Sequence, residues 1–402
     1  MEQYHKYIGI KSIFYFCSLP LRLDSYRGCT YGCLYCFSQS LNNRESGFHY
    51  RAVPANPADF IKLMDSINHE GRQTSLVRSC LKRKIPIHFG CVSDPLQPQE
   101  IKSRITLKFL KILKQYNYPF ILCTKSDLII NPEYLSIIRD TRPIVQISFS
   151  TMNDKLASYI EPHAPSPTIR LRTLDKLSNL GIWTVARLQP FLYPKEQIND
   201  EGLRSLANVG VKHVTLEHLR IPTNSKLSTR MSLWNALGVN LLETYRNLGI
   251  KHSRINYELN SEIKLHNILK AKNIIHKYGM SFGSGDNDFH HASDYFCCCG
   301  VPADKSEFSN IYKGNIGYAA YKSLKTGTVS FSCIDEEWQP KGSVREYINS
   351  DCRINNLNSI KELFRFKIKN PTTSNSPISF YGIQYFNDKY IINEEIRKKI
   401  VR

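Results

Sequence analysis

Short apolar runs alternate with longer amphipathic stretches between Pro86 and about Leu219. The apolar runs have the length of buried strands, and the stretches between them repeat hydrophobic residues at helical spacing. Strands are expected at residues 87–92, 120–123, 144–148, 183–186 and 213–216, and helices near residues 105–116, near 134–139 and before Gly181. Such alternation is typical of β-α units around a parallel sheet. With a further strand expected before Cys29, the pattern predicts an α/β fold of six units.

The pattern changes beyond about Gly285. Cysteines and histidines gather there amid Gly-, Ser- and Asn-rich segments, and the chain ends in a short basic helix predicted from Glu394 to Arg402. We therefore expect a core at residues 1–285, which includes an N-terminal extension. A smaller, Cys- and His-containing α+β accessory region is expected at 286–402. The length of 402 residues fits one large barrel plus such a region.

The charge balance favours an anionic partner. The chain has 54 Lys and Arg against 35 Asp and Glu, a net charge of +19. An excess of this kind attracts polyanions, because each neutralised phosphate releases condensed counterions. We expect a nucleic acid or a nucleotide-like substrate. The alternative is a codon bias toward Lys that only enriches the solvated surface.

Hydropathy and cysteine usage predict a soluble, cytoplasmic protein with no membrane partner. No apolar run approaches the roughly 20 residues of a membrane span, and the first residues, with Glu2, His5 and Lys6, lack the layout of a signal peptide. Twelve cysteines in such a chain indicate reduced thiols and metal ligands rather than a disulfide framework.

Three cysteines in one short stretch are the strongest chemical signal. Cys29, Cys33 and Cys36 form a Cys-x3-Cys-x2-Cys motif. Three thiolates can hold a 4Fe-4S cluster and leave its fourth iron open to a ligand. A structural zinc site is the alternative, but zinc takes a fourth protein ligand. The nearest candidate for it in the sequence is His49.

This motif resembles that of the radical S-adenosylmethionine (SAM) superfamily. The residues after the expected strands, at 90–100, 124–127 and 148–151, and the segment 161–166 before a helix with Arg170, come in an order that resembles the spore photoproduct lyase group, also called DNA repair photolyase-like proteins. The resemblance covers about Leu21 to Arg220. It implies a partial (β/α)6 barrel of the TIM type, a 4Fe-4S cluster, SAM, and an electron donor of the flavodoxin or ferredoxin type.

Position by position, the resemblance assigns the cofactor contacts. Cys29, Cys33 and Cys36 would hold the cluster. Five residues would bind SAM, and these are Ser93, Asp94, Lys125, Ser148 and Ser150. A lysine cation suits the SAM carboxylate, and hydroxyl groups suit its ribose. The alternatives are a chain turn at Asp94-Pro95 and a helix cap at Ser148.

The resemblance also points to catalytic residues. Cys91 lies where these lyases return a hydrogen atom to the product radical, although it could also be a small buried strand-end residue. The lyases have a tyrosine after the third cluster cysteine, and this chain has Phe37, which has no O–H group. Tyr35 is the tyrosine that remains as a candidate, but alone it does not restore the lyase relay.

A second metal or iron-sulfur site is expected in the accessory region. Its candidate ligands are Cys297, Cys298, Cys299 and Cys333, with Cys352, His290 and His291 nearby. Three adjacent cysteines cannot all face one ion, so one or two of them are expected to ligate and another to pack. The alternative is a substrate-facing loop or buried thiols.

Three functional hypotheses follow. The first is a radical SAM enzyme that cleaves SAM to a 5'-deoxyadenosyl radical and takes hydrogen from a nucleic acid or nucleobase. The second keeps this chemistry but acts on a peptide or small metabolite, with an auxiliary cluster. The third is a metal-bearing nucleic-acid-binding protein that is not an enzyme.

Overall fold

The computed structural model describes most of the chain, and the account below concerns these residues alone. They are residues 3–11, 17–40, 51–68, 75–252, 256–295, 297–302, 305–334, 357, 359–370 and 382–400. His49 and Cys352, both named above as candidate ligands, lie outside them.

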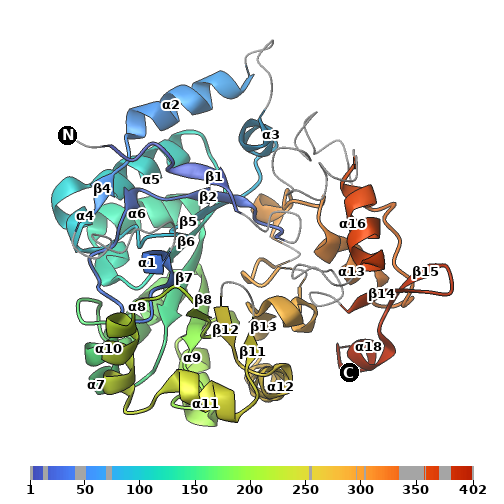
Figure 1. The fold of residues 1–402 in the computed structure, drawn as a ribbon. Coiled ribbons are helices and arrows are strands. Elements are labelled where there is room, and N and C mark those ends of the chain that lie inside the picture. Colours follow the sequence, from blue (N-terminus) through green and yellow to red (C-terminus); the bar gives the residue numbers. More distant parts are fainter. Residues whose placement is uncertain are drawn as a thin grey trace.

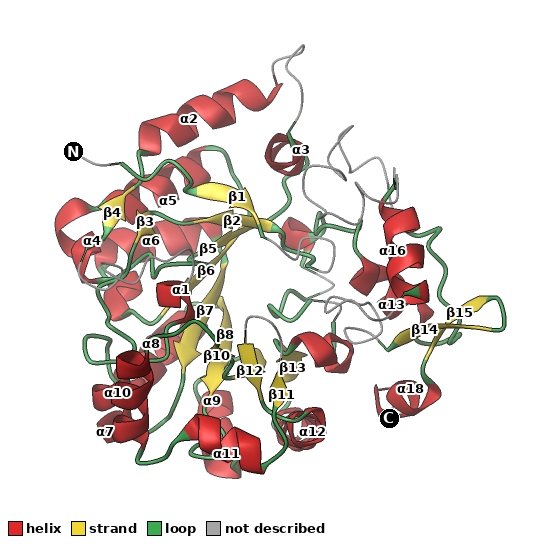
Figure 2. Ribbon diagram, in the orientation of Figure 1, coloured by secondary structure: helices red, strands yellow, loops and turns green. Residues whose placement is uncertain are grey.

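An eight-stranded sheet organises the molecule (Figures 1 and 2). Its strand order is β1-β2-β5-β6-β7-β8-β9-β13. β1 pairs antiparallel with β2, and every later pairing in the sheet is parallel. The strands are β1 (Ile8–Ile10), β2 (Leu21–Leu23), β5 (Ile87–Phe89), β6 (Phe120–Thr124), β7 (Ile144–Phe149), β8 (Trp183–Phe191), β9 (His213–His218) and β13 (Ser281–Ser284).

Helices between the strands cover one face of this sheet (Figure 1). They are α2 (Pro57–Asp65), α3 (Leu76–Lys82), α4 (Pro98–Ser103), α5 (Ile105–Gln115), α6 (Pro132–Thr141), α7 (Asp154–Ile160), α8 (Pro167–Asn179), α9 (Asp200–Asn208) and α12 (Ser261–Lys277). Local chemistry fixes where several begin. Asn131 and Ser166 accept hydrogen bonds from backbone N–H groups of α6 and α8, and a proline follows each cap.

Smaller elements surround the sheet. β10 (Ile221–Pro222), β11 (Lys251–His252) and β12 (Asn256–Glu258) form a three-stranded sheet, and β3 (Tyr26–Arg27) pairs with β4 (Val53–Pro54). Near this second sheet lie α10 (Leu227–Leu237) and α11 (Leu241–Asn247), and α1 (Phe37–Ser40) follows Cys36. The C-terminal elements are α13 (Ile316–Ser323), α16 (Ile360–Lys369), β14 (Ile383–Phe386), β15 (Lys389–Ile392) and α18 (Glu394–Ile400). They lie on the other side of the sheet from α5, α6 and α8 (Figure 1).

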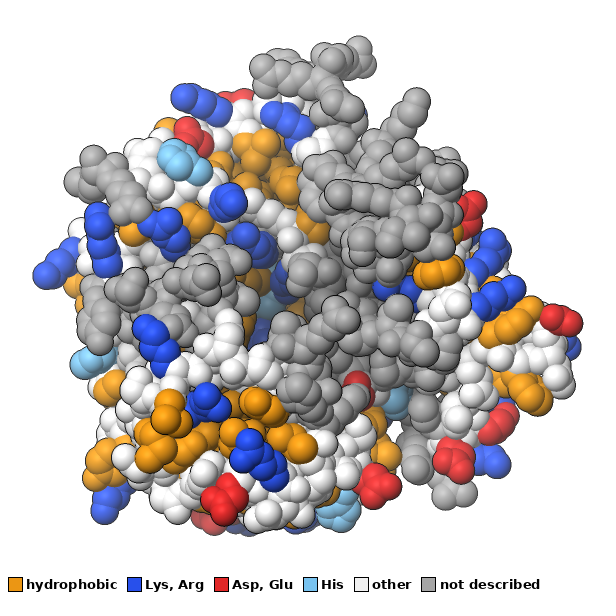
Figure 3. Space-filling model, viewed as in Figure 1, with side chains coloured by type: hydrophobic (Ala, Val, Ile, Leu, Met, Phe, Trp, Pro, Cys, Tyr) orange, Lys and Arg blue, Asp and Glu red, His pale blue; other side chains and the backbone are white. Residues whose placement is uncertain are grey.

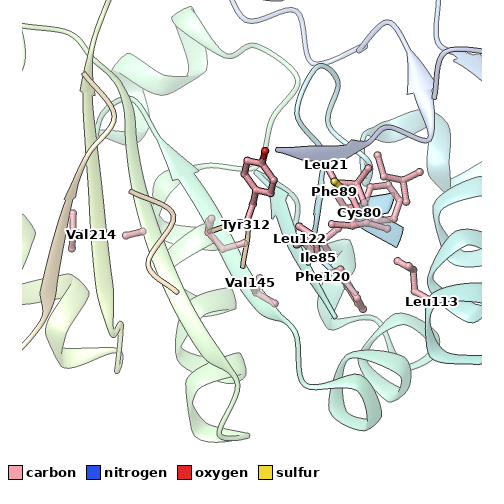
Figure 4. Close-up of a cluster of buried hydrophobic side chains, with 14 of the residues drawn as sticks. Leu21, Cys80, Ile85, Phe89, Leu113, Phe120, Leu122, Val145, Val214 and Tyr312 are labelled. Atoms are coloured by element: carbon pink, nitrogen blue, oxygen red, sulfur yellow. The ribbon is translucent and has the colours of Figure 1, made fainter. Parts of the chain in front are cut away.

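Alternation along the strands separates two environments. Side chains such as Phe89, Leu122 and Val145 point toward the helices and form the main hydrophobic cluster (Figure 4). Tyr312, from the C-terminal region, belongs to the same cluster. The opposite face carries His88, Gln146 and Arg187, and this inner face is partly polar.

The sheet curves around its inner face. The Arg187 Nη1 atom on β8 lies 3.4 Å from Nε2 of His88 on β5, with β6 and β7 between them. In a flat sheet these strands would be roughly 14 Å apart, because neighbouring strands are about 4.8 Å apart. The Arg187 and His88 side chains extend toward each other over the inner face and span the width of β6 and β7.

Apolar side chains fill this concave surface near the amino ends of the strands. We call them the base cluster: Leu19, Ile121, Ile144, Val185, Cys297, Cys299, Val301, Phe308 and Ile311. Ile121, Ile144 and Val185 come from adjacent strands, and Cys297 to Ile311 come from the C-terminal region. The accessory segment thus packs into the barrel rather than beside it. The predicted division at residue 286 stays a prediction.

The predicted fold class is confirmed. All six expected strands are in the sheet, and the structure adds β1 and β13 at its edges. The expected helices correspond to α5, α6 and α8. In the described part of the chain no pairing joins β1 to β13, so the barrel is partial.

Candidate active site

The three motif cysteines lie on one loop at the carboxyl ends of the strands. We call residues 28–36 the thiol loop. Gly28 and Gly32 turn it with φ angles of 95° and 68°, which favour glycine. Cys29 and Cys33 are buried and Cys36 is half-buried, and the three belong to one small cluster with Tyr31.

Contacts from other elements fix the position of the thiol loop. Gln97 donates from Nε2 to the Gly28 carbonyl at 2.9 Å and accepts from the Thr30 N–H at 2.8 Å. The Leu34 N–H donates to the carbonyl of Ile160, the last residue of α7, at 2.9 Å. Contacts from two sides therefore hold the loop in place independently of a cofactor.

Burial keeps the thiols of this loop protonated. It raises the pKa of Cys29 to about 12 and the pKa values of Cys33 and Cys36 above the ordinary thiol range. Thiols in such an environment are inert by themselves, and a metal makes them thiolates by displacing their protons. The donor set of three neighbouring sulfurs fits the predicted 4Fe-4S cluster, which takes one thiolate on each of three irons.

The described residues contain no group of three His, Cys, Asp or Glu side chains arranged around one metal ion.

A buried carboxylate stands beside the thiol loop. Glu161, after α7, is fully buried and accepts hydrogen bonds from the Tyr35 hydroxyl, from Ser150 Oγ at 2.8 Å and from Arg170. Burial opposes its charge, but Arg170 and Lys125 outweigh burial, so the pKa of Glu161 lies below its usual value. Arg170 also donates to the Ser148 carbonyl at 2.9 Å. This network joins the thiol loop to the ends of β7 and α7.

Lys125 extends over the same network. Its Nζ lies 3.9 Å from Glu161 Oε1 and 5.8 Å from the centre of the Tyr35 ring. Burial works against the ammonium charge, but Glu161 and then Cys33 raise the pKa of Lys125. A cation is thereby held next to the thiols.

Ser93 and Asp94 make contacts within the protein. Ser93 donates to the Tyr26 carbonyl at 2.6 Å. Asp94 accepts from the backbone N–H groups of Leu96 and Lys125 at 2.9 and 2.7 Å and from the Thr124 hydroxyl at 2.7 Å. The structure therefore gives both residues a role in joining strand ends, and their predicted contacts to SAM stay predictions.

Ser148 and Ser150 are buried at the end of β7. The Ser148 hydroxyl lies 3.6 Å from the thiol of Cys123 on β6, and Ser150 donates to Glu161. Both side chains are on the same edge of the sheet as Lys125 and the thiol loop, as predicted from strand topology.

Cys91 lies at the end of β5, half-buried. Its Sγ donates to the His88 carbonyl at 3.3 Å, and its N–H donates to Asp24 at 2.9 Å. Asp24 also accepts from the Val92 N–H at 2.7 Å, so this carboxylate sets the backbone around Cys91. Burial raises the pKa of Cys91 to about 12, which keeps its S–H bond intact.

The C-terminal cysteines separate into two places. Cys297 and Cys299 are in the base cluster, with Cys298 packed against it. Cys333 packs against the main hydrophobic cluster, and its Sγ donates to the Ser330 carbonyl at 3.5 Å. The structure brings Cys297 to Cys299 into the barrel and assigns Cys333 to different surroundings.

Sequence reasoning did not select Glu161, Arg170 or Asp24 as site residues. Glu161 and Arg170 were visible in the segment before α8, but their pairing depends on the position of that helix. Asp24 pairs with Arg22 two positions before it, but its contacts to the Cys91 and Val92 N–H groups join residues 67 and 68 positions apart, which the sequence did not reveal.

Comparisons with known proteins agree with this geometry at the level of the fold. A spore photoproduct lyase mutant with dinucleoside spore photoproduct matches 70% of this chain and 80% of its own, at 15% identity and a TM-score of 0.51. Another mutant of that lyase covers the same shares at 16% identity and a TM-score of 0.50. The resemblance to the spore photoproduct lyase group, predicted from the sequence, is thus confirmed at the level of the fold.

A curated relative adds little about function. It is the uncharacterized protein ORF301 of Acidianus two-tailed virus, 27% identical over 200 residues. The match covers 48% of this chain and 64% of that relative, so the chain spans less than two thirds of its length. No family model matches the chain.

Across the described residues, every helix is too short or too polar to cross a membrane.

Proposed function

We propose that this chain is a radical SAM enzyme. The observation that carries the proposal is the thiol loop at the carboxyl edge of a partial barrel, with the cation of Lys125 held beside it. A bound 4Fe-4S cluster with SAM on its open iron would supply one-electron cleavage of the sulfonium to a 5'-deoxyadenosyl radical. In a barrel, chemistry gathers at the carboxyl ends of the strands, where this loop lies.

The chain's own residues would bind and orient the cofactors. Cys29, Cys33 and Cys36 would hold the cluster, and burial of the loop keeps bulk water from them. Lys125 would meet the SAM carboxylate, since its ammonium group is a compact cation. Ser148 and Ser150 lie within the same edge of the sheet and would contact the ribose or amino end. Ser93 and Asp94 would shape the adjoining turn and face SAM from it.

Two residues would handle hydrogen atoms. Cys91 keeps its S–H bond at neutral pH and would return a hydrogen to a substrate radical. The thiyl radical left on Cys91 would be reduced by an electron from the flavodoxin- or ferredoxin-type donor and a proton from solvent. The Tyr35 hydroxyl donates a hydrogen bond to Glu161. Burial and, next to it, the negative charge of Glu161 keep the pKa of Tyr35 well above its usual value. Its O–H bond is thus retained, while Phe37 offers none.

The proposed substrate is a nucleic acid or nucleobase. The net charge of +19 supports it, as does the dinucleoside bound to the lyase of similar fold. Lys and Arg side chains are spread over the described part of the face in Figure 3, so the charge on this face marks no single binding track. A flavodoxin or ferredoxin would supply the electron, in a cytoplasmic setting. The predicted second cluster remains a part of the peptide or metabolite alternative.

Anaerobic reconstitution with iron and sulfide tests the proposal. With dithionite and SAM, the protein is expected to release 5'-deoxyadenosine, measured by chromatography. Single alanine variants of Cys29, Cys33 and Cys36 should lose most of the iron and reduce the product at least 100-fold. Cys80→Ala is the matched control, because Cys80 is a buried thiol on α3, outside the loop. Zinc bound at the loop, with no 5'-deoxyadenosine formed by the wild type, would refute the proposal.

A further inference from the structure

Two cations and a histidine meet on the inner face of the barrel. Lys11 follows β1, and its Nζ lies 2.6 Å from Nδ1 of His88 on β5. Arg187 on β8 approaches the other ring nitrogen of His88 at 3.4 Å. The two positive groups therefore stand on either side of one imidazole ring, in a layer above the base cluster.

Lys11 and Arg187 contact neutral groups. Arg187 donates to the Gln146 amide oxygen at 2.8 Å and to the Gln189 amide oxygen. In the part of the chain that the structure describes, neither Lys11 nor Arg187 has a carboxylate within ion-pair distance. The nearby carboxylate of Glu217 is engaged by Arg220 and by the Gln189 amide.

The surroundings supply little negative charge. Burial and then Lys11 lower the pKa of His88 to about 4, so the ring is neutral at neutral pH. The Cys91 thiol near Lys11 is also neutral there.

A charge removed from water is costly unless a partner of opposite sign compensates it. Lys11 and Arg187 keep part of their surface accessible to solvent, as do Cys91, Gln189 and Glu217. The group is thus reachable from outside while enclosed by the strands. Two positive side chains, with no carboxylate at ion-pair distance among the described residues, therefore lie around one imidazole ring on the inner face of the sheet.

We propose that Lys11, His88 and Arg187 form an oxyanion subsite that binds a phosphate group of the substrate. The inference rests on the proposed function, because it places the substrate's phosphate next to Cys91, the proposed hydrogen donor. Lys11 offers a point charge and Arg187 a planar set of N–H donors, as the several acceptor oxygens of a phosphate require, while His88 accepts from Lys11 and positions it. A nucleotide would then enter the barrel with its phosphate on this inner wall and its sugar or base toward the SAM side.

Isothermal titration of the cluster-loaded protein, anaerobic and without reductant, tests the subsite. The probes are inorganic phosphate and the dinucleotide thymidylyl-thymidine, at constant ionic strength. The wild type should bind both, and thymidine without phosphate should bind at least tenfold more weakly than the dinucleotide. Succinate serves as the carboxylate probe, and tighter binding of succinate than of phosphate would overturn the assignment.

Charge-removing variants locate the binding. Lys11→Met and Arg187→Gln should each weaken binding of both phosphate probes at least tenfold, whereas Arg187→Lys should retain it within about threefold. Arg172→Gln with Lys176→Met is the matched control, because both side chains are exposed on α8. Equal loss in the control, or no loss in either single variant, would overturn the subsite.

Folding is checked by circular dichroism. If Lys11→Met or Arg187→Gln fails to fold, the wild-type protein provides the test. Its melting temperature should rise saturably with phosphate and should not rise with chloride at equal ionic strength; no rise with phosphate would refute the subsite. Phosphate binding without any 5'-deoxyadenosine formation would refute the proposed function but not the subsite. Formation of 5'-deoxyadenosine without phosphate binding would refute the subsite but not the proposed function.

Discussion

At the scale of single residues, Glu161 joins the candidate site together. It is fully buried and receives hydrogen bonds from Tyr35, Ser150 and Arg170. A buried carboxylate with these partners holds three elements in register, and it also sets the orientation of the Tyr35 ring beside Lys125. Removing its charge would leave Arg170 buried without a counter-ion.

Glu161→Gln is therefore expected to lower the free energy of unfolding by about 3–5 kcal/mol, the usual cost of breaking a buried ion pair. Anaerobic urea unfolding measures it. The control is Glu133→Gln, which removes an exposed pair with Arg104 and should cost at most about 1 kcal/mol.

Glu161 should also make the free energy of unfolding depend on pH. The folded-state pKa of Glu161 lies below its unfolded value of about 4.3. Its contribution to stability is thus fully present above pH 4.3 and is lost as the pH falls through the folded pKa. The stability gap between wild type and Glu161→Gln should narrow below pH 4. A gap that widens there would contradict the assignment.

At the scale of elements, the ends of neighbouring strands are tied by side chains rather than by pairing alone. Asp94 connects the turn after β5 to the end of β6 through Thr124 and the Lys125 N–H. This geometry gives Asp94 a structural role in addition to the one proposed toward SAM, and the two roles can be separated by experiment.

Asp94→Ala should lower the free energy of unfolding by about 1–3 kcal/mol, because backbone donors in a partly buried turn lose their acceptor. Asp127→Ala, an exposed position in the next turn, should change it by about 0.5 kcal/mol or less. Urea unfolding of the SAM-free protein compares the two. Identical midpoints for Asp94→Ala and wild type would show that Asp94 has no structural role.

The elements also show what a sequence can and cannot reveal. Hydrophobic periodicity predicted β6, β7 and α5 well, since burial on one face leaves a local pattern. It did not show that β8 extends to Phe191, because Arg187 and Gln189 interrupt the apolar run. The contact of Lys11 with His88 joins residues 77 positions apart on β5 and after β1, and no local pattern encodes it.

The cysteine motif, in contrast, could be read from local sequence spacing. Three thiols within eight residues share one loop in almost any fold, so the thiol loop could be predicted from spacing. The positions of Cys297 to Cys299 could not, because their packing in the base cluster is set by strands that lie far away in sequence.

At the scale of the whole molecule, the accessory region completes the core. Phe308 and Ile311 pack with Ile121, Ile144 and Val185 inside the concave sheet. Tyr312 extends the same segment into the main hydrophobic cluster. Core and accessory region are therefore expected to unfold together.

Phe308→Ala should lower the free energy of unfolding by about 3–5 kcal/mol, since a buried aromatic ring leaves a cavity. Phe386→Ala is the control: Phe386 is 60% exposed, and its loss should change stability by about 0.5 kcal/mol or less. Calorimetry is expected to show one transition for both. Two separate transitions, with Phe308→Ala affecting only one, would support an independent accessory domain.

The base cluster has a consequence for synthesis on the ribosome. Its strand residues emerge long before Phe308 and Ile311, which cover the strand residues of this cluster from a late part of the chain. During translation, Ile121, Ile144 and Val185 therefore face water on a half-built surface. A nascent chain in this state is open at its base, so a chaperone could protect it there until the last third of the protein has been made.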